Sequence, residues 1–424
     1  MTDADTSAAT VPSVPYRPDP TGGCPHAAHA RLLAEGRQVV PVVLPGEVPG
    51  AAVIGHEALK EFLTHPEVGK DVRHFAALHE GGVPEGWPLA TFVRVRGMTT
   101  ADGPDHRRLR SLVSRALTPR RVAELRPRVV ALTTRLLDGL ERRAVEGDGI
   151  VDLHRHFALP LPLSVIGELL GVGSAHLDRL HHLSIQLVST DIDPQEALAA
   201  NREMVALLTA VVEERRTAPG EDLTSALLAA REEDGDRLDA QELVGTLLLM
   251  IVAGHETTLN LIVNAVRALG AHPDQLDLVR RSRASWADVV EETLRWDGPV
   301  SLFPFRYPVR DIEIGGTVLR RGTPVLAGYS AAGRDPAAHG PDADRFRVAR
   351  EPLARHLSLG HGAHFCPGAP LARMEAEVAL GALFERFPGL RPVGADAELP
   401  RHPSFVGNGV LELPVRLGTA PRAR

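Results

Sequence analysis

The sequence contains very little cysteine and few aromatic residues for its length. It has 2 cysteines among 424 residues, and aromatic side chains make up 4% of the chain. Two cysteines, Cys24 and Cys366, are too few for a disulfide framework, so the small disulfide-stapled secreted domains are excluded. Cys24 lies in a leader rich in glycine and proline, which leaves Cys366 as the cysteine that needs an explanation.

Clusters of positive charge and an apolar N-terminal run are also missing. The formal net charge is -7, the only lysines are Lys60 and Lys70, and arginines are spread along the chain. A nucleic-acid-binding surface needs concentrated positive charge, so we expect no nucleic-acid partner. The first 20 residues contain neither a basic start followed by an apolar run nor a stretch long enough to span a bilayer. We therefore expect a cytoplasmic protein without a membrane partner.

The chain does contain enough apolar residues for a large core. Hydrophobic residues make up 44% and charged residues 24%, as in ordinary globular proteins. Most of the chain has helical apolar spacing, with short strands predicted at Val39–Leu44, at Ala51–Ile54 and between Ile312 and Leu326. We expect a mainly α fold with a minor β-sheet region, built as a flexible lead over residues 1–20 and a single domain over residues 21–424.

Two predicted helices begin with capping boxes, in which a side chain at the helix start and an acidic residue three positions later bond to each other's backbone. Asp239 and Glu242 open an apolar stretch that ends near Leu269, about 45 Å of helix at 1.5 Å per residue. Such a helix must cross the whole molecule. Ser285 and Asp288 open a shorter one.

Cys366 lies in the segment Leu359-Gly-His-Gly-Ala-His-Phe-Cys-Pro-Gly368, just before a predicted helix that begins near Ala369 and Pro370. At a helix N-terminus the dipole and the free amide groups stabilise a thiolate, which a sulfur-ligated iron needs. The glycines of this segment allow the backbone to approach a flat macrocycle closely. The alternative is a buried structural cysteine in a glycine-rich loop.

The same segment resembles the haem-binding loop of the cytochrome P450 family, Phe-Gly-x-Gly-x-His/Arg-x-Cys-x-Gly. Leu359 stands where the family usually has phenylalanine, and the other positions match. The resemblance implies that Cys366 is the axial ligand of the iron of haem b, and that Leu359, Gly360, His364 and Gly368 contact the cofactor.

The predicted long helix contains Ala-Gly-His-Glu-Thr-Thr at 253–258, similar to the family's Ala-Gly-x-Asp/Glu-Thr oxygen-binding groove. The resemblance implies that Ala253 and Gly254 leave room for dioxygen, and that Glu256 and Thr257 are catalytic residues that relay protons. The alternative is a buried helix that tolerates a few polar residues.

Two further features match the family. Glu292 and Arg295 resemble its Glu-x-x-Arg pair, which shares one helix face and is structural rather than catalytic. The resemblance also implies four partners for the haem propionates: His106, Arg110, Arg306 and His364.

The resemblance extends from about Tyr16 to Pro414 and implies a monooxygenase of bacterial secondary metabolism. Such an enzyme inserts one oxygen atom of O2 into a lipophilic small molecule that is macrolide-, polycyclic- or steroid-like. Its electrons come from NAD(P)H through a ferredoxin reductase and a ferredoxin. By analogy the substrate pocket is lined by Leu89, Phe92, Leu249, Val252, Ala253, Leu302, Phe303 and Val406.

Parts of the sequence are also compatible with three other functions. Oxidative coupling or rearrangement on the same haem stays open. A haem-based sensor or carrier would need no proton relay, so Glu256 and Thr257 argue against it. The pair His255-Glu256 also occurs in zinc proteases, but their second histidine is absent because position 259 is Leu.

Overall fold

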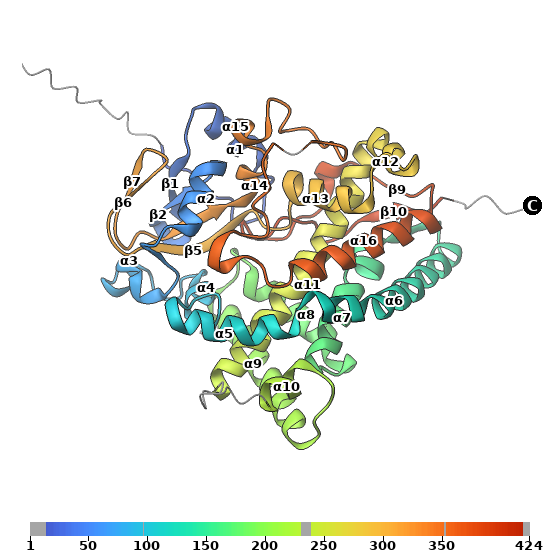
Figure 1. Cartoon of the computed structure of the whole chain (residues 1–424), viewed down its shortest axis with the longest axis horizontal. Coiled ribbons are helices and arrows are strands. Elements are labelled where there is room, and N and C mark those ends of the chain that lie inside the picture. Colours follow the sequence, from blue (N-terminus) through green and yellow to red (C-terminus); the bar gives the residue numbers. More distant parts are fainter. Residues whose placement is uncertain (1–13, 96, 230–238, 352, 419–424) are drawn as a thin grey trace, which may run out of the picture.

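A computed structural model describes residues 14–95, 97–229, 239–351 and 353–418. Helices form most of the described chain, and the largest of three small sheets lies on the left in Figure 1. The predicted fold class, mainly α with a minor β-sheet region, is confirmed.

Sixteen α-helices are present in the described residues. In chain order they are α1 (His26–Ala34), α2 (His56–Thr64), α3 (Ala76–His79), α4 (Ala90–Arg94), α5 (Gly103–Ala116), α6 (Pro119–Glu146), α7 (Pro160–Leu170), α8 (Ser174–Val188), α9 (Pro194–Thr217), α10 (Leu223–Ala229), α11 (Ala240–Ala271), α12 (Pro273–Arg280), α13 (Trp286–Asp297), α14 (Tyr329–Ala332), α15 (Pro336–His339) and α16 (Ala369–Arg386).

The strands form a five-stranded sheet in the order β1-β2-β8-β5-β3, a three-stranded sheet in the order β4-β10-β9, and the hairpin β6-β7. Their bounds are β1 (Val39–Leu44), β2 (Val48–Val53), β3 (Val68–Gly69), β4 (Ile150–Asp152), β5 (Leu302–Pro308), β6 (Ile312–Ile314), β7 (Thr317–Leu319), β8 (Val325–Gly328), β9 (Arg391–Pro392) and β10 (Pro414–Arg416). The predicted strand at 39–44 is confirmed, and the one predicted at 51–54 lies at 48–53.

An irregularity in β5 affects the site described below. The register of β5 on β8 shifts between Phe303 and Arg306. Pro304 lies inside this break, and proline cannot donate a hydrogen bond to a neighbouring strand. Bulges of this kind redirect the side chains on either side of them. Phe303 and Arg306 both line one internal cavity.

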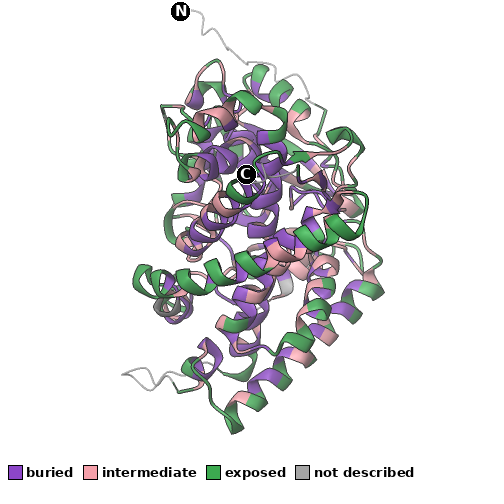
Figure 2. Cartoon of the chain, turned by 90° about the vertical axis from the view of Figure 1, so that its right-hand side faces the viewer, coloured by how far each residue is buried: buried purple, intermediate pink, exposed green. Residues whose placement is uncertain are grey.

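The central helix is α11, drawn in yellow in Figure 1. Asp239 and Glu242 form its capping box, as predicted, and the helix continues for 32 residues, about 48 Å. It packs against α7, α9, α13 and α16. Its length and apolar composition would suit a membrane span, but 72% of the relevant window is buried inside the fold. The burial view agrees, with buried helix at the centre and exposed residues on the outer faces (Figure 2). α11 is therefore the core helix that the sequence predicted.

The start of the described chain lies against the sheet. The backbone of Tyr16 pairs with β1, donating to Pro41 and accepting from Val43. Thr190, at the end of α8, donates its hydroxyl to the carbonyl of Pro20 at 2.9 Å. Backbone contacts thus begin before residue 20, while the division into a lead and one domain stays a prediction.

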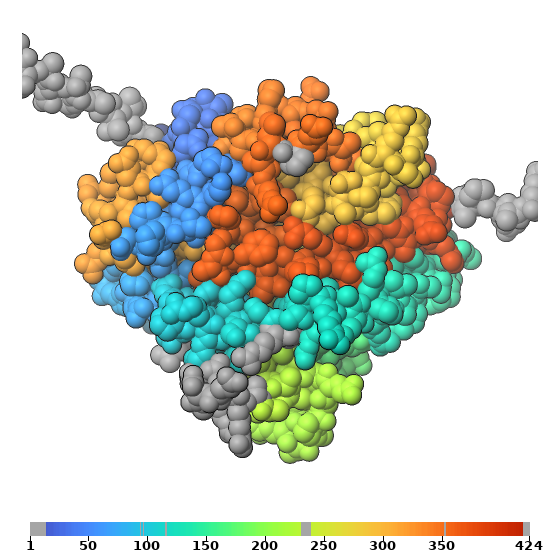
Figure 3. Space-filling view, viewed as in Figure 1, coloured from blue at the N-terminus to red at the C-terminus, as the bar shows by residue number. Residues whose placement is uncertain are grey.

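The second predicted capping box is also present. Ser285 and Asp288 bond reciprocally at the start of α13, which runs to Asp297. α13 packs on both α11 and α16. On the face shown in Figure 3, α16 and the segment before it (red-orange) lie at the surface beside α5 and α6 (teal). The cysteine segment is thereby placed between the surface and α11.

Candidate active site

Cys366 lies in the turn directly before α16. Its backbone N–H donates to the carbonyl of Leu359 at 2.8 Å, which folds the segment back on itself. Gly360 and Gly362 have φ values of +79° and +70°, a conformation that other residues rarely adopt. Burial raises the pKa of the Cys366 thiol, and the backbone N–H of Gly368 acts in the opposite direction. The sulfur is therefore sheltered from water and close to the amide donors of a helix start, which moderate the electron donation of a metal-bound thiolate.

A cavity of ≈ 250 Å³ reaches this cysteine. Its walls come from α5, α7, α11, α13, β5 and the cysteine segment. The residues singled out in the sequence that line it are Arg110, Leu249, Ala253, Gly254, Thr257, Phe303, Arg306, Leu359, Gly360, His364, Cys366 and Gly368. The fold thus gathers side chains that are up to about 260 positions apart around one space.

Four basic side chains lie together, and we call them the basic cluster: Lys70, His106, Arg306 and His364. All but His106 line this cavity. The imidazole rings of His106 and His364 have their centroids 4.0 Å apart. Burial lowers the pKa of His364, and the charges of Lys70 and Arg306 lower it further. Burial also lowers the pKa of Lys70 well below its ordinary value. Arg110, the remaining predicted propionate partner, donates to the carbonyl of Phe365 at 2.6 Å.

The basic cluster fits an anionic cofactor. The nearby Asp102 uses its carboxylate to accept the backbone N–H groups of Lys70 and Asp71, at 2.8 and 3.0 Å. His106 Nε2 is buried and has no hydrogen-bond partner. Buried cations and donors are stable only when they are paired, so the cluster has unused capacity for acidic groups. The two propionates of haem would supply these groups.

Lys70 is the member of the cluster that the sequence reasoning missed. One signal was present, since Lys70 is one of only two lysines in a chain whose positive charge is otherwise arginine.

Across the cavity, α11 presents the segment that resembles an oxygen-binding groove. The hydroxyl of Thr257 donates to the carbonyl of Ala253 at 2.8 Å, one turn earlier. Gly254 lines the cavity, and a Cβ atom added there would lie 3.0 Å from Ile166 of α7. Glycine at this position therefore serves the close packing of two helices as well as the shape of the cavity.

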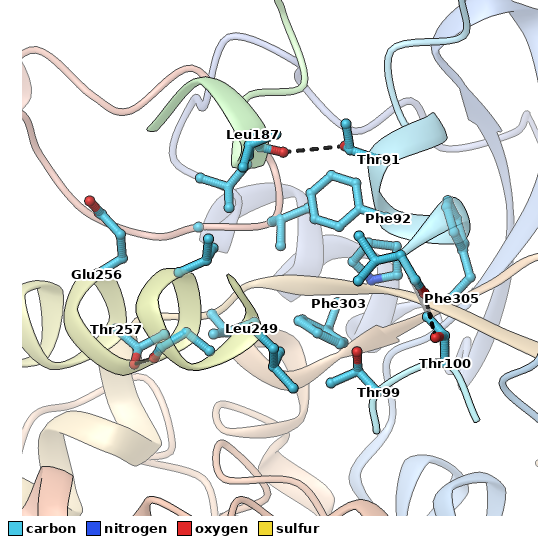
Figure 4. A pocket seen from close by; sticks show the side chains of 18 of the residues that line it. Thr91, Phe92, Thr99, Thr100, Leu187, Leu249, Glu256, Thr257, Phe303 and Phe305 are labelled. Atoms are coloured by element: carbon cyan, nitrogen blue, oxygen red, sulfur yellow. Dashed lines mark hydrogen bonds between the residues drawn. The ribbon is translucent and has the colours of Figure 1, made fainter. Parts of the chain in front are cut away.

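Glu256 points in a different direction from Thr257, as Figure 4 shows. Its carboxylate lies 2.9 Å from Nδ1 of His181 and 3.3 Å from Nε2 of His255. Burial disfavours the charged form of Glu256, but the two imidazoles outweigh burial and hold its pKa well below the ordinary range. The predicted catalytic pair thus comprises a hydroxyl facing the cysteine cavity and a carboxylate held by histidines.

Behind the cavity, Glu292 and Arg295 form a buried ion pair with both side chains 5% exposed. Arg295 donates to both carboxylate oxygens, at 2.7 and 2.8 Å. It also donates to the backbone carbonyls of Gly333, Ala343 and Arg345. The pair therefore joins α13 to the segments that follow β8, which agrees with a structural role.

A second hollow, of ≈ 180 Å³, shares Lys70, Ala253, Thr257 and Phe303 with the first, so the two lie side by side. Its wall is mostly apolar, and Figure 4 shows Phe92, Leu249 and Phe303 facing it from different elements. Of the residues predicted to line a substrate pocket, six line this hollow: Phe92, Leu249, Val252, Ala253, Phe303 and Val406.

Leu89 and Leu302, also predicted for the pocket wall, are placed elsewhere. Both are fully buried in the apolar cluster between the five-stranded sheet and α4, and neither is among the residues lining the two hollows. They support the wall residues Phe92 and Phe303, which pack against the same cluster. The wall also carries polar groups that the sequence reasoning did not anticipate, among them Thr99, Asn201 and His402.

Comparison with known proteins gives one consistent family. The family model described as Cytochrome P450 matches residues 286–407. The chain is 38% identical over 404 residues to 2-hydroxy-5-methyl-1-naphthoate 7-hydroxylase of Streptomyces carzinostaticus, covering 95% of this chain and 97% of the relative. It is 39% identical to 6-deoxyerythronolide B hydroxylase of Saccharopolyspora erythraea, covering 92% and 96%.

Solved structures agree with this. A "Testerone bound" form of CYP154C4 from Streptomyces sp. ATCC 11861 superimposes with a TM-score of 0.91. Its sequence is 44% identical, and the match covers 96% of this chain and 99% of that one.

Proposed function

The chain belongs to the cytochrome P450 family of monooxygenases, and we propose that it hydroxylates a lipophilic polycyclic, macrolide-like or steroid-like molecule. The observation that carries this proposal is the position of Cys366. Its sulfur lies at the start of α16, at a cavity that Lys70, Arg306, His364 and the groove segment of α11 also line. Mostly apolar walls also line the second hollow beside it.

Members of this family use haem iron and O2. In this chain Cys366 would hold the iron, and Lys70, His106, Arg306 and His364 would hold the propionates. When bound, the haem supplies the oxygen-activating chemistry, with electrons that we propose come from NAD(P)H. Leu359 and Gly360 would pack against the macrocycle on the side of the sulfur. The unpartnered Nε2 of His106 supports this assignment, because it provides a buried donor for a carboxylate.

Proton delivery is the proposed role of Glu256 and Thr257. Oxygen activation consumes protons, and in a pocket that excludes water they must arrive through side chains or ordered water. The Thr257 hydroxyl is positioned to hold such a water, since it lines the cavity from α11. Glu256 contacts two imidazoles, at 2.9 Å and 3.3 Å, through which protons could reach it. Thr257 would therefore pass protons on next to the oxygen, and Glu256 would supply the protons that replace them.

The substrate class is inferred from the wall and from the relatives. Phe92, Leu249, Val252 and Phe303 offer an apolar surface, so binding of an uncharged lipophilic molecule is favoured by burial of apolar area. The names of the relatives include a naphthoate and a deoxyerythronolide, both carbon-rich ring systems. Thr99 and Asn201 provide polar contacts that would orient such a ring system.

The proposal also includes a ferredoxin and a ferredoxin reductase as electron donors, in the cytoplasm. A test combines purified protein with surrogate ferredoxin, its reductase and NADPH. A panel of polycyclic, macrolide and steroid compounds is first screened for those that displace water from the haem iron, read from the absorption spectrum. Hits should raise NADPH consumption and give products heavier by one oxygen atom. Coupled or rearranged products without added oxygen would favour the alternative chemistry, and binding without NADPH consumption would favour a sensor or carrier.

A further inference from the structure

Three ligand atoms meet beside the second hollow. Nδ1 of His181 lies 3.1 Å from Nε2 of His255, and the Glu256 oxygen Oε1 lies 2.9 Å from the first and 3.3 Å from the second. His181 belongs to α8, whereas His255 and Glu256 are neighbours on α11. From this geometry we propose that His181, His255 and Glu256 bind one Zn²⁺ ion.

The distances match a tetrahedral zinc site. Zinc binds imidazole nitrogen at 2.0–2.1 Å and carboxylate oxygen at 2.0–2.2 Å, so two ligands of one tetrahedral ion lie about 3.3 Å apart. The three observed separations differ from this value by less than about half an ångström. Closing around an ion would thus need only small side-chain movements.

The proton positions call for a cation between these atoms. Nδ1 of His255 lies 2.6 Å from the carbonyl of Ile251, which can only accept, so this nitrogen carries the ring proton. In the neutral form of His255, Nε2 then presents a lone pair to a carboxylate oxygen 3.3 Å away, and a metal ion can take the place of the second ring proton that an imidazolium would carry. Two acceptors face each other at a place where the His255 side chain is 0% exposed. A metal-binding histidine typically donates its other nitrogen to a carbonyl in this way.

His181 cannot satisfy both acceptors well on its own. Its Nδ1 holds at most one proton, which points toward either His255 or Glu256. Glu256 Oε1 accordingly has no hydrogen bond of acceptable geometry, although it is buried. One ion at the centre of the triangle would satisfy all three atoms together.

A fourth ligand is also at hand. His402 lines the same hollow as Glu256, and neither of its buried ring nitrogens has a hydrogen-bond partner. A water from the hollow would complete the tetrahedron, since His402 lies outside the group of ligand atoms within 4.8 Å of one another. Two imidazoles favour zinc over magnesium or calcium, which prefer oxygen ligands. Zinc proteases take their second histidine from the same helix, four residues after the first, where this chain has Leu259. Here the second histidine, His181, comes from α8.

Zinc at this position would immobilise Glu256. Inhibition by zinc rests on the proposed role of Glu256 in proton delivery, whereas zinc binding does not depend on that role. Bound zinc should therefore lower product formation without displacing haem or substrate.

The test measures zinc content in the haem-loaded protein. Protein incubated with zinc sulfate is freed of unbound ion by gel filtration, and zinc and iron are measured together by mass spectrometry, so that iron counts the folded protein. Wild type should retain one zinc per iron. His181→Asn and His255→Asn should each weaken zinc binding by more than tenfold. His182→Asn removes an exposed histidine next in sequence and should bind as wild type does.

The proposal would be overturned by equal zinc content in wild type, His181→Asn and His255→Asn. It would also be overturned if wild type retained no zinc, because the cluster would then hold only a shared proton. If His255→Asn does not fold, as judged by its haem spectrum, His181→Asn decides the question. In crystals soaked with zinc, an anomalous peak within the triangle would support the proposal, and a peak only at surface histidines would contradict it. Zinc that binds without inhibiting turnover would contradict the role of Glu256 and leave the site intact.

Discussion

The side-chain nitrogen of Lys70 lies 5.0 Å from the centre of the Phe303 ring, and both residues line the cavity that reaches Cys366. A cation over an aromatic face gains about 0.5–2 kcal/mol, less than the cost of burying an ammonium group. Burial accordingly lowers the pKa of Lys70, and the charge of Arg306 lowers it further. An anion at this position would offset the cost of burying the ammonium group. Lys70 therefore contacts the apolar wall through Phe303 and is placed to pair with an acidic group of the cofactor.

Lys70→Met should therefore have opposite effects on the two forms of the protein. The free energy of haem binding should weaken by about 1–3 kcal/mol, because a propionate loses a charged partner. The haem-free protein should melt at a higher temperature, because a buried charge is gone. Haem transfer to apomyoglobin and thermal unfolding measure the two effects. Lys60→Met, at the exposed lysine, should change neither.

Cys366→His should keep part of the haem and abolish oxygenation. Imidazole can ligate iron but does not supply the electron density with which a thiolate assists cleavage of the O–O bond. The absorption spectrum of the reduced carbon monoxide complex should change from the thiolate type to the imidazole type. Cys24→Ser, at the other and exposed cysteine, is the matched control and should retain the wild-type spectrum.

Thr257→Ala should separate NADPH oxidation from product formation. The variant loses the hydroxyl that we propose holds water beside the oxygen, so oxygen should leave as hydrogen peroxide before it is used. Product per NADPH should fall several-fold while peroxide rises. Thr257→Ser keeps the hydroxyl and should restore most of the yield. Equal yields for alanine and wild type would show that substrate or water supplies the relay.

Glu292→Gln should destabilise the fold. It leaves the guanidinium of Arg295 buried without its carboxylate, a loss that is typically about 3–5 kcal/mol. Denaturant unfolding of the purified protein measures it. Glu124→Gln breaks the exposed pair of Arg120 and Glu124, and its cost should stay below about 1 kcal/mol. Similar small losses in both variants would contradict the structural role of the buried pair.

Glu375 on α16 should make stability depend on pH. Burial raises its pKa to about 8, and its buried Oε2 has no hydrogen-bond partner. The folded form therefore holds a proton that the unfolded chain releases near its ordinary pKa. The stability that depends on protonated Glu375 is therefore fully present below the pKa of the unfolded chain, and it is lost as pH rises toward the folded-state pKa of about 8. Glu375→Gln should match wild type near pH 4 and exceed it increasingly up to pH 8, by at most about 5 kcal/mol. Thermal midpoints across this range test the prediction.

The sequence predicted those helices whose first residues form a recognisable capping motif. The capping boxes at Asp239 and Ser285 mark the starts of α11 and α13 because a cap depends on residues three positions apart. The pair Glu292 and Arg295 could be read for the same reason, since one helix turn brings the two side chains together.

Contacts between distant segments could not be read in this way. Leu89 and Leu302 are apolar, as pocket residues are, but only the packing of α4 on the sheet decides that they face the core. His181 meets Glu256 because α8 passes beside α11, a crossing that no local pattern encodes. Lys70 joins the basic cluster through a loop that follows β3.

The scarcity of lysine has a practical consequence for handling the protein. Lys70 is enclosed in the interior, whereas Lys60, on the outer side of α2, has a side chain that is 48% exposed. Apart from the α-amino group, an amine-reactive dye or resin would find a single accessible attachment point. α2 packs against the sheet and α14, and Lys60 does not line either of the two hollows. The protein could thus be tethered to an electrode or bead in one orientation, with both hollows left accessible.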